Sequence, residues 1–283
     1  MFIQFPPPLR LSAYVDSLLL QEEWSPINYA NRSPVKVLPS AMTVIGIQYG
    51  EPMSVLADGE AKLLGSSGLT GMQTAPREYV STGRIGTIIV RFKPGGLTAF
   101  TAYPIHEFLD ANVDLKLVFP PHAVDEMEQR LREAADAAGR IAAVNRFLLA
   151  VCRDKPAVGL PLHIAEQIDQ AAGQVSIEHL AAQAFVSKRT LERHFNEAIG
   201  ISPKKFAGIL RFQQAIRLRK AGCSYLDIVE ACGYSDHAHF ARDFKTFAGC
   251  TPEPFFRGES QPELARHFND YEARASFQAI MYQ

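Results

Sequence analysis

Five polar side chains lie at helical spacing on what would be one exposed helix face: Lys188, Arg189, Glu192, Arg193 and Asn196. Leu191 and Phe195, four residues apart, would share the opposite face and pack inward. A helix fits the major groove of DNA, and an Arg side chain can read guanine there through two hydrogen bonds. The residue types and their spacing therefore predict a helix that reads base pairs.

A second stripe of this kind follows about 49 residues later. Its inward positions are Phe240, Phe244 and Phe247, and its exposed positions are His237, Ala238, Ala241, Arg242 and Lys245. Because this stripe carries fewer long polar side chains, we expect the first helix to do most of the base reading. The second would read through His237 and Arg242, with alanine methyl groups contacting thymine.

The two stripes belong to a duplicated unit. Before a short turn, the offset between matched residues is 48, and the pairs are Leu180 with Ile228, Phe185 with Gly233 and Ser187 with Ser235. After the turn the offset is 49, and the pairs are Leu191 with Phe240, Arg193 with Arg242, Phe195 with Phe244, Gly200 with Gly249, Pro203 with Pro252 and Phe206 with Phe255. One extra residue at the second turn explains the change. An isolated stripe would usually be a solvated helix face, but two copies in register favour a repeated structural unit.

Each copy has the parts of a helix-turn-helix. The predicted helices cover residues 177–184, 188–198 and 225–232, with a fourth after residue 236. The predicted N-caps are Ser176, Ser187, Ser224 and either Ser235 or Asp236. A long helix over 203–221, capped by Ser202 and ended by Gly222, would join the copies.

The linker helix has a length that suits two reading helices. Nineteen helical residues span roughly 28 Å, and successive major-groove faces lie roughly 34 Å apart. The predicted phosphate contacts are Arg211, Arg217, Ser187 and Ser235, with Arg219 and Lys220 also available.

The first 120 residues have a different character. Short β-branched or apolar runs, such as 42–49 and 87–92, alternate with turns rich in Gly, Pro, Asp and Ser, which favours a small barrel or sandwich. Helical spacing begins near His122 and returns over 141–151. We therefore expect an α+β protein: a β-rich, barrel-like sensor or dimerisation domain with flanking helices over 1–154, an all-α DNA-binding domain of two helix-turn-helix units joined by a long helix over 155–258, and a loosely helical or partly disordered tail over 259–283.

Composition excludes several other classes. The chain is 47% hydrophobic and 21% charged, as in globular proteins. No apolar run approaches the roughly 20 residues of a membrane helix, and the first residues do not read as a secretory signal, so we expect a cytoplasmic protein. The net charge of −1 hides a difference between the two parts of the chain. Residues 171–257 hold 12 basic residues (Lys and Arg) and 8 acidic ones (Asp and Glu), whereas the rest of the chain holds 17 basic and 22 acidic residues. A basic C-terminal module suits phosphate.

The four cysteines are Cys152, Cys223, Cys232 and Cys250, and none forms a C-x-x-C pair. We expect them to be buried, reduced thiols, with redox sensing as the open alternative. His237 and His239 stand two apart and would point to different helix faces, which argues against a metal site. We expect no catalytic residues, no metal and no cofactor.

These residues resemble the AraC/XylS family of transcription regulators, over 180–206, 211–218 and 233–255. The resemblance implies a seven-helix DNA-binding domain with two recognition helices in adjacent major grooves. It places base reading on Arg189, Glu192 and Arg193 in the first helix, and on His237, Ala238 and Arg242 in the second. Val229 stands where the family usually has a small Ala, so we expect the second unit to pack slightly differently.

The N-terminal half is similar, over 37–39 and 90–96, to the β-rich, often cupin-like domains that precede this module in some family members. The resemblance implies that it binds a small effector or mediates dimerisation. His106 is the one histidine in the first 120 residues, too few for a metal-dependent cupin enzyme.

The expected partner is double-stranded DNA. Further candidates are a small-molecule effector, a second copy of the chain as a homodimer and, for an activator, RNA polymerase; we expect no membrane partner. Two alternatives stay open: an enzyme linked to a DNA module, such as an alkyl-acceptor repair protein, and an effector-binding protein with no DNA target. The first lacks a cysteine before Cys152 to act as nucleophile.

Overall fold

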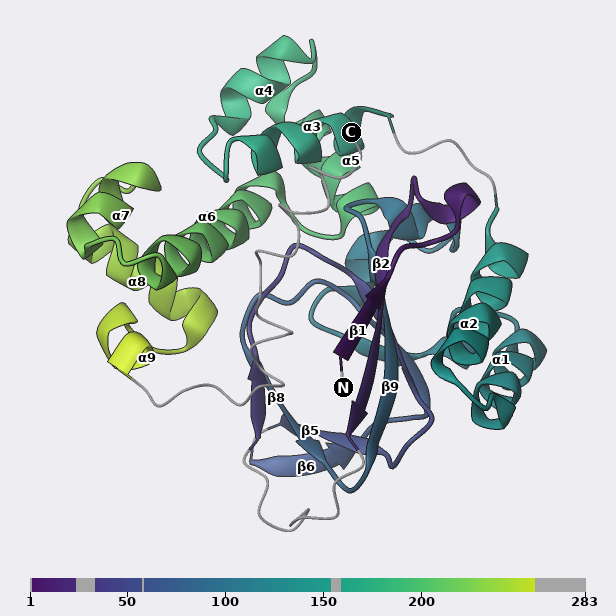
Figure 1. The fold of residues 1–283 in the computed structure, drawn as a ribbon. Helices are drawn as coiled ribbons and strands as arrows, with labels where there is room; N and C mark the ends of the chain where they lie inside the picture. Colours follow the sequence, from purple (N-terminus) through teal and green to yellow (C-terminus); the bar gives the residue numbers. More distant parts are fainter. Residues whose placement is uncertain (1, 24–33, 58, 154–158, 258–283) are drawn as a thin grey trace.

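The computed structural model describes residues 2–23, 34–57, 59–153 and 159–257. Over these residues the protein is α+β, with a strand-rich N-terminal half and a helical C-terminal half (Figure 1). The expected domain boundary at 154–155 and the expected tail over 259–283 lie outside the described residues and stay predictions.

The N-terminal half contains two antiparallel sheets. The larger has the order β1 (Phe2–Phe5), β2 (Val15–Glu23), β9 (Ile85–Phe92), β4 (Val44–Gln48), β7 (Ser67–Thr70) and β10 (Asn112–Asp114). The smaller has the order β3 (Val35–Val37), β8 (Arg77–Ser81), β5 (Met53–Ala57) and β6 (Glu60–Leu63). The strands predicted over 42–49 and 87–92 are confirmed as β4 and β9.

Side chains on the larger sheet alternate between two environments, as the pleat requires. Ile45, Ile47, Ile88 and Val90 are buried in one hydrophobic cluster that also includes residues of two helices, α1 (Pro121–Glu133) and α2 (Ala137–Val151). Their neighbours in sequence face the smaller sheet and are mostly small or polar. The main core of this half therefore lies between the larger sheet and the helices, not between the two sheets.

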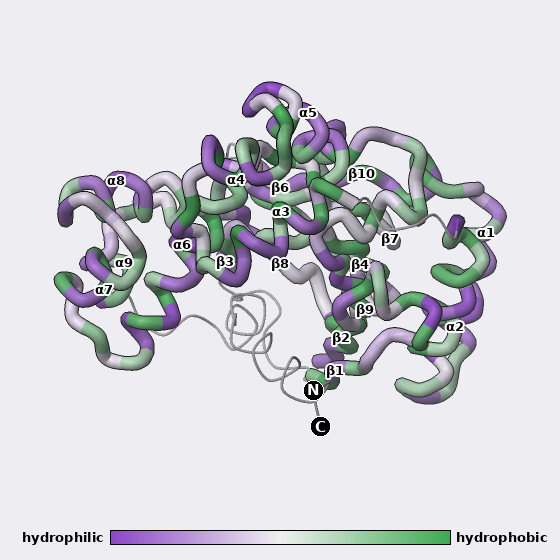
Figure 2. Tube along the Cα trace, turned by 90° about the horizontal axis from the view of Figure 1, so that it is seen from above, coloured by the Kyte–Doolittle hydropathy of each residue, from purple (hydrophilic) through white to green (hydrophobic). Residues whose placement is uncertain are grey.

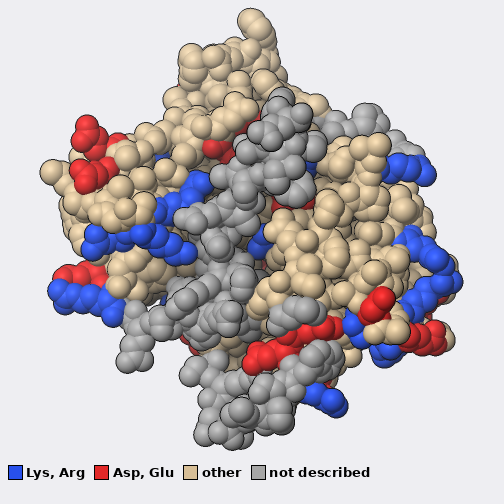
Figure 3. All heavy atoms as spheres, in the orientation of Figure 1, with Lys and Arg blue, Asp and Glu red and all other residues tan. Residues whose placement is uncertain are grey.

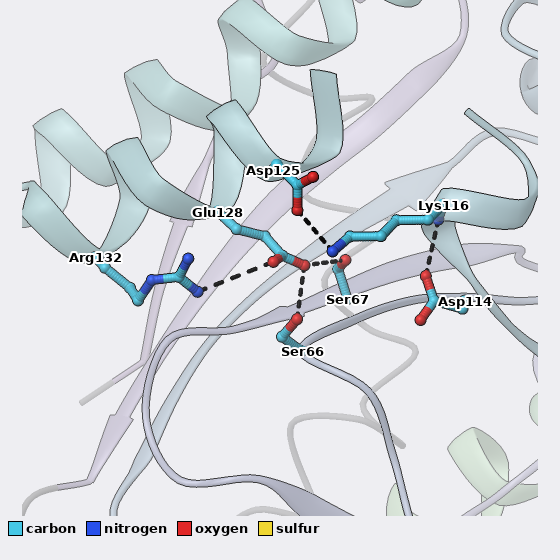
Figure 4. Close-up of polar contacts among 7 residues, drawn as sticks. All are labelled: Ser66, Ser67, Asp114, Lys116, Asp125, Glu128 and Arg132. Carbon is cyan, nitrogen blue, oxygen red and sulfur yellow. Dashed lines mark hydrogen bonds and ion pairs between the residues drawn. The ribbon is translucent and has the colours of Figure 1, made fainter. Parts of the chain in front are cut away.

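Buried polar contacts attach α1 and α2 to the sheet. The carboxylate of Glu128 on α1 accepts hydrogen bonds from the hydroxyls of Ser66 and Ser67, at 2.7 and 2.5 Å (Figure 4). On α2, Arg140 Nη1 lies 2.9 Å from Glu22 Oε1, and Glu22 also accepts from the Tyr49 hydroxyl. The carboxylates of Glu22 and Glu128 are thus paired where they are buried, while Arg140 Nε has no hydrogen-bond partner among the described residues.

Seven helices form the described C-terminal half: α3 (Gly159–Gln170), α4 (Ile177–Gln183), α5 (Lys188–Ile199), α6 (Pro203–Lys220), α7 (Tyr225–Ala231), α8 (His237–Ala248) and α9 (Pro252–Arg257). The helices predicted over 177–184, 188–198, 203–221 and 225–232 are confirmed to within one residue at each end. Among the helices of the described ranges, none is long and apolar enough to cross a bilayer.

The two halves share a hydrophobic cluster. Leu38, Ala41 and Met72 of the β-rich half are buried in the same cluster as the core of helices α3 to α8. The end of α5 packs on a short 3₁₀ turn, η4 (Ile105–Phe108). Seen from above, in Figure 2, α6 to α9 lie on one side of the sheets, and α1 and α2 lie on the opposite side. The helical half is therefore held directly against the sheets.

Candidate nucleic-acid interface

The turn between α4 and α5 is a left-handed one. Phe185 has a φ of 54°, and Gly233 has a φ of 67° at the matching position between α7 and α8. The side chain of Phe185 is 97% exposed. Left-handed backbone is costly for a residue with a β-carbon, whereas glycine adopts it readily. The two turns therefore have the same backbone shape, built from a strained residue in one copy and an unstrained one in the other.

The caps of the recognition helices locate the extra residue. The Ser187 hydroxyl accepts from Thr190 N at the start of α5, and the Asp236 carboxylate accepts from His239 N at the start of α8. These caps are 49 residues apart, while the left-handed turn residues are 48 apart. The predicted insertion thus lies between Gly233 and Asp236. The sequence allowed either Ser235 or Asp236 as the N-cap of α8, and in the structure the cap is Asp236.

The inward faces of both recognition helices are as predicted. Leu191 and Phe195 of α5 are fully buried, as are Phe240 and Phe244 of α8. The helices end at Gly200 and Gly249, both with positive φ, which closes the helix without strain. The remaining face of each helix is consequently fixed toward solvent.

On α5, Lys188, Arg189 and Arg193 are exposed, and Glu192 and Asn196 are half-buried. Lys188 Nζ donates to Glu178 Oε1 of α4 at 2.6 Å. Arg193 lies 3.2 Å from the His194 ring. The five side chains predicted to read bases therefore lie on one face, but Lys188 is paired with a carboxylate in the free protein.

The Lys188–Glu178 contact has an electrostatic signature. The hydrogen bond from Lys188, helped by backbone amides at the start of α4, lowers the pKa of the Glu178 carboxyl to about 2. The same contact raises the pKa of Lys188. Phosphate oxygens would have to compete with this carboxylate for the Lys188 ammonium.

On α8, His237, Ala238, Arg242 and Lys245 are exposed. The ring of His237 stands edge-on to Tyr225, with ring centroids 5.8 Å apart. It belongs to a larger aromatic group, which comprises Tyr225, Tyr234, His239, Phe240, Phe244, Phe255 and Phe256. The exposed face of α8 thus has fewer free polar side chains than the exposed face of α5. One of them, His237, packs against the ring of Tyr225.

Val229 is buried beneath the second recognition helix, in the cluster that includes Phe240. This is the position at which the sequence led us to expect slightly altered packing. Its side chain is 9% exposed, and the altered packing and its effect on DNA contacts stay predictions.

Two basic residues of α6, Arg211 and Arg219, are engaged within the protein. Arg211 Nη2 lies 3.5 Å from Asp243 Oδ2, and Arg219 Nη1 donates to the Cys223 carbonyl at 2.9 Å. Arg217 is half-buried, and Lys220 is exposed. In Figure 3, Lys and Arg side chains gather at the left, where Figure 1 places α6 to α8. The phosphate contacts predicted for Arg211, Arg217, Ser187 and Ser235 stay predictions, and Arg211 would first have to leave Asp243.

The sequence did not indicate two polar side chains that tie the module together. Gln174 Nε2 donates to the Ala231 carbonyl at 2.6 Å and so links the start of the first copy to α7. Gln213 is buried on α6, and its Nε2 lies 3.4 Å from the Pro39 carbonyl of the β-rich half. Gln213 lies at an inward position of the predicted helix, and this position was the one feature of the sequence that could have indicated its burial. Gln174 is in a loop and has none.

No group of three or more His, Cys, Asp or Glu side chains that could hold a metal ion occurs within the described ranges. Burial raises the pKa of the Cys232 thiol to about 11, because desolvation outweighs the opposing effect of the Arg211 and Arg217 charges. Cys232 is therefore protonated at neutral pH, and the thiolate that redox chemistry requires is scarce.

Two known domain families match parts of this chain. The helix-turn-helix domain family matches residues 180–258, and a domain of unknown function, DUF6597, matches residues 3–114. The HTH-type transcriptional activator RhaS of Escherichia coli is 32% identical over 100 residues, which are 35% of this chain and 36% of RhaS. The match thus spans about a third of the length of this relative.

Solved structures with a similar chain path include ToxT from Vibrio cholerae O395, at 10% identity and a TM-score of 0.45, over 90% of this chain and 98% of ToxT. The C-terminal domain of AraT, a response regulator from Geobacillus stearothermophilus, is 21% identical with a TM-score of 0.35, over 38% of this chain and 93% of that domain. The two duplicated helix-turn-helix units lie within or directly next to the residues that match the helix-turn-helix domain family. Residues 180–258 are therefore similar to the helix-turn-helix domain of transcription regulators such as RhaS.

Proposed function

We propose that this protein is a sequence-specific DNA-binding transcription regulator that places α5 and α8 in adjacent major grooves. The observation that carries the proposal is the duplicated, capped recognition helix with a buried apolar face and an exposed polar one. The spacer α6 has 18 residues and is about 27 Å long, close to the spacing of successive groove faces. The α6 cap, Ser202, and its buried face keep this spacer rigid.

Base reading is divided unequally in this proposal. Arg189, Glu192 and Arg193 of α5 supply most direct contacts to base edges, with Lys188 and Asn196 beside them. His237, Ala238 and Arg242 of α8 supply the remainder, with Lys245 toward the backbone. Exposed Arg and Lys at the start of a recognition helix are well suited to guanine.

The β-rich half would control this activity in the cytoplasm, by binding a small effector or by forming a homodimer. If the output is activation, RNA polymerase is a further partner. An alkyl-acceptor enzyme is not favoured, because the match of residues 180–258 to the helix-turn-helix domain family supports a regulator. A purely effector-binding protein would leave both exposed recognition faces without a role.

The test is selection of binding sites from random duplexes by the full-length protein. We expect two half-sites about one helical turn, or roughly 10 base pairs, apart. Affinity for the selected site should fall steeply with salt, because each neutralised phosphate releases counterions. If no sequence is enriched, or if binding ignores salt, the proposal is wrong.

A further inference from the structure

Strand β6 (Glu60–Leu63) forms one edge of the four-stranded sheet. Among the described residues it pairs with β5 alone, so its outer edge has no partner strand there. All four of its side chains are exposed, and Leu63 is 61% exposed. A strand whose two faces and outer edge are open is a template for pairing with another chain.

The ladder between β5 and β6 shows which backbone groups of β6 point outward. Leu64 N donates to Met53 O at 2.8 Å. In an antiparallel ladder, the backbone N–H and C=O groups of every second residue point to the same side. Those of Lys62 therefore also point toward β5, and those of Ala61 and Leu63 point away from it.

The charges on β6 favour one occupant for this edge, a second copy of the same strand. A two-fold axis through Ala61 would place the two Ala61 residues opposite each other, and each Glu60 opposite the Lys62 of the other copy. Opposite charges at directly opposed positions stabilise a pair of strands, and like charges destabilise it. An axis through Glu60 or Lys62 would instead bring like charges together.

The backbone favours the same register. Because the N–H and C=O of Ala61 point outward, the two Ala61 residues would exchange both hydrogen bonds across the axis. Glu60 and Lys62 would then form the non-hydrogen-bonded pairs, in which side chains are closest and Cα atoms lie about 4.5 Å apart. An axis through Leu63, also an outward residue, would leave both charges unmatched. Lys62 would deter pairing with an arbitrary strand, but the register about Ala61 neutralises it.

Other surfaces of the β-rich half are less suited to a second copy. Two further edge strands, β1 and β3, have mostly half-buried or buried side chains. On α1, Arg130 forms an ion pair with Glu126, and Gln129 donates to Glu133, so these exposed polar groups already have partners. β6 lies at the lower end of the molecule in Figure 1, away from α5 and α8. Pairing at β6 therefore leaves both recognition faces free.

We propose that two copies of this protein associate through β6, in antiparallel register about Ala61, so that their four-stranded sheets form one continuous sheet. The inference assigns a surface to the homodimer named in the proposed function, and the use of the dimer on DNA rests on that function. The pairing itself does not depend on DNA and is measured without it.

Association is tested on the full-length protein by sedimentation velocity over a range of concentrations. Because the paired strands are short, we expect a weak dimer with a Kd on the order of 100 µM. Ala61→Pro removes the outward N–H, which β5 does not use, and should weaken association by about tenfold or more. Ala61→Val, which keeps that N–H and suits a strand, should retain association. A wild type that stays monomeric up to about 1 mM would overturn the proposal.

The register is tested by exchanging charges. Glu60→Lys and Lys62→Glu should each weaken self-association by about tenfold or more, because each places like charges opposite one another. An equal mixture of these two variants should associate as well as the wild type, since every cross-strand pair is then of opposite charge. Glu133→Lys, which makes the same change at an exposed carboxylate on α1, should have no effect. Failure of the mixture to associate would overturn the register and with it the proposal.

On DNA, a two-fold dimer should prefer a duplex that carries the selected site twice in inverted orientation, at one of a series of spacings. The wild type should bind this duplex about tenfold or more tightly than a duplex with one site. Ala61→Pro should lose that gain and keep its affinity for the single site. An equal gain in Ala61→Pro would place the dimer contact elsewhere. A protein that dimerises but binds no duplex would instead overturn the proposed function and leave the β6 contact standing.

Discussion

The two helix-turn-helix copies share a backbone plan and differ in what surrounds it. The end of α5 rests on the β-rich half: a β-carbon on Gly200 would come within 2.9 Å of Ile105, and one on Gly95 within 3.2 Å of Ile199. The second copy is instead built around the aromatic group that includes Phe240 and Phe244. The first copy thus makes the closer contact with the β-rich half, since a β-carbon on the matching Gly249 would lie 3.5 Å from Lys36 and Pro76.

The exposed faces of α5 and α8 also differ. The face of α5 presents long charged side chains, of which Lys188 is already paired with Glu178. The exposed face of α8 presents His237, Ala238 and Arg242. The ring of His237 packs edge-on against Tyr225. Duplication therefore preserved the packing face and left the exposed face free to diverge, because only the packing face is needed for each copy to fold.

The largest effect is expected from removing one Arg in each copy. Arg193→Ala should cost about 1–3 kcal/mol of binding free energy on a selected duplex and relax the preference at one base position. Arg242→Ala should cost less and relax fewer positions. Both are measured by titrating duplexes that carry single base changes.

Arg146→Ala is the matched control, since Arg146 is an exposed arginine on α2 in the other half. It should leave DNA binding unchanged. A uniform loss across all sequences for Arg193→Ala would make Arg193 a phosphate contact. A larger loss for Arg242→Ala would reverse the proposed division between the copies.

The second effect concerns the left-handed turns and is read from stability. Gly233→Ala should lower the free energy of unfolding by about 1–2 kcal/mol, because a β-carbon disfavours this backbone and would lie 2.9 Å from Gln174 Oε1. Phe185→Gly should leave stability unchanged or raise it by up to about 1 kcal/mol, because relief of strain offsets the added chain entropy of glycine. Chemical denaturation measures both, and equal losses in the two variants would contradict the comparison.

The third effect is that of the caps. Ser187→Ala and Asp236→Ala should each cost about 1 kcal/mol of stability. Ser235→Ala should cost little, since Asp236 is the residue that accepts from the helix amide. A larger loss for Ser235→Ala than for Asp236→Ala would move the inserted residue to the other side of the cap.

The smallest effect is a titration. Because the folded pKa of Glu178 is about 2, below its ordinary value of 4.5, its contribution to stability is present above pH 4.5 and is lost as the pH falls toward 2. The side chains of both partners are exposed, so the change in stability should be slight. Carboxyl NMR should give a Glu178 pKa near 2 in the wild type, and Lys188→Met should raise it toward the ordinary value. An unchanged titration in Lys188→Met would show that the ion pair does not form in solution.

Sequence reasoning was strongest where structure depends on neighbours along the chain. Helices α4 to α7 were predicted closely, because apolar spacing and N-capping side chains are local signals. β2 was not predicted, since Leu18 to Leu20 are flanked by Ser, Gln and Glu and show no alternation. The contact between the halves was also missed, because Leu38 and Met72 are isolated apolar residues whose burial depends on a distant part of the chain.

The candidate site shows the same limit. The exposed stripes of α5 and α8 follow from helical periodicity, and the structure has them on single faces. The pairing of Lys188 with Glu178, and of Arg211 with Asp243, joins residues of different helices and could not be read from spacing. Such pairs decide which basic groups are free, and they require the tertiary arrangement.

The apolar side chains of the six-stranded sheet that form the main core of the β-rich half lie on one face of the sheet. Residues such as Ile45 and Val90 are needed for folding, whereas Gly46 and Gln73 contribute little to the core on the other side. Substitutions at inward positions would therefore change the space between the two sheets without threatening the fold.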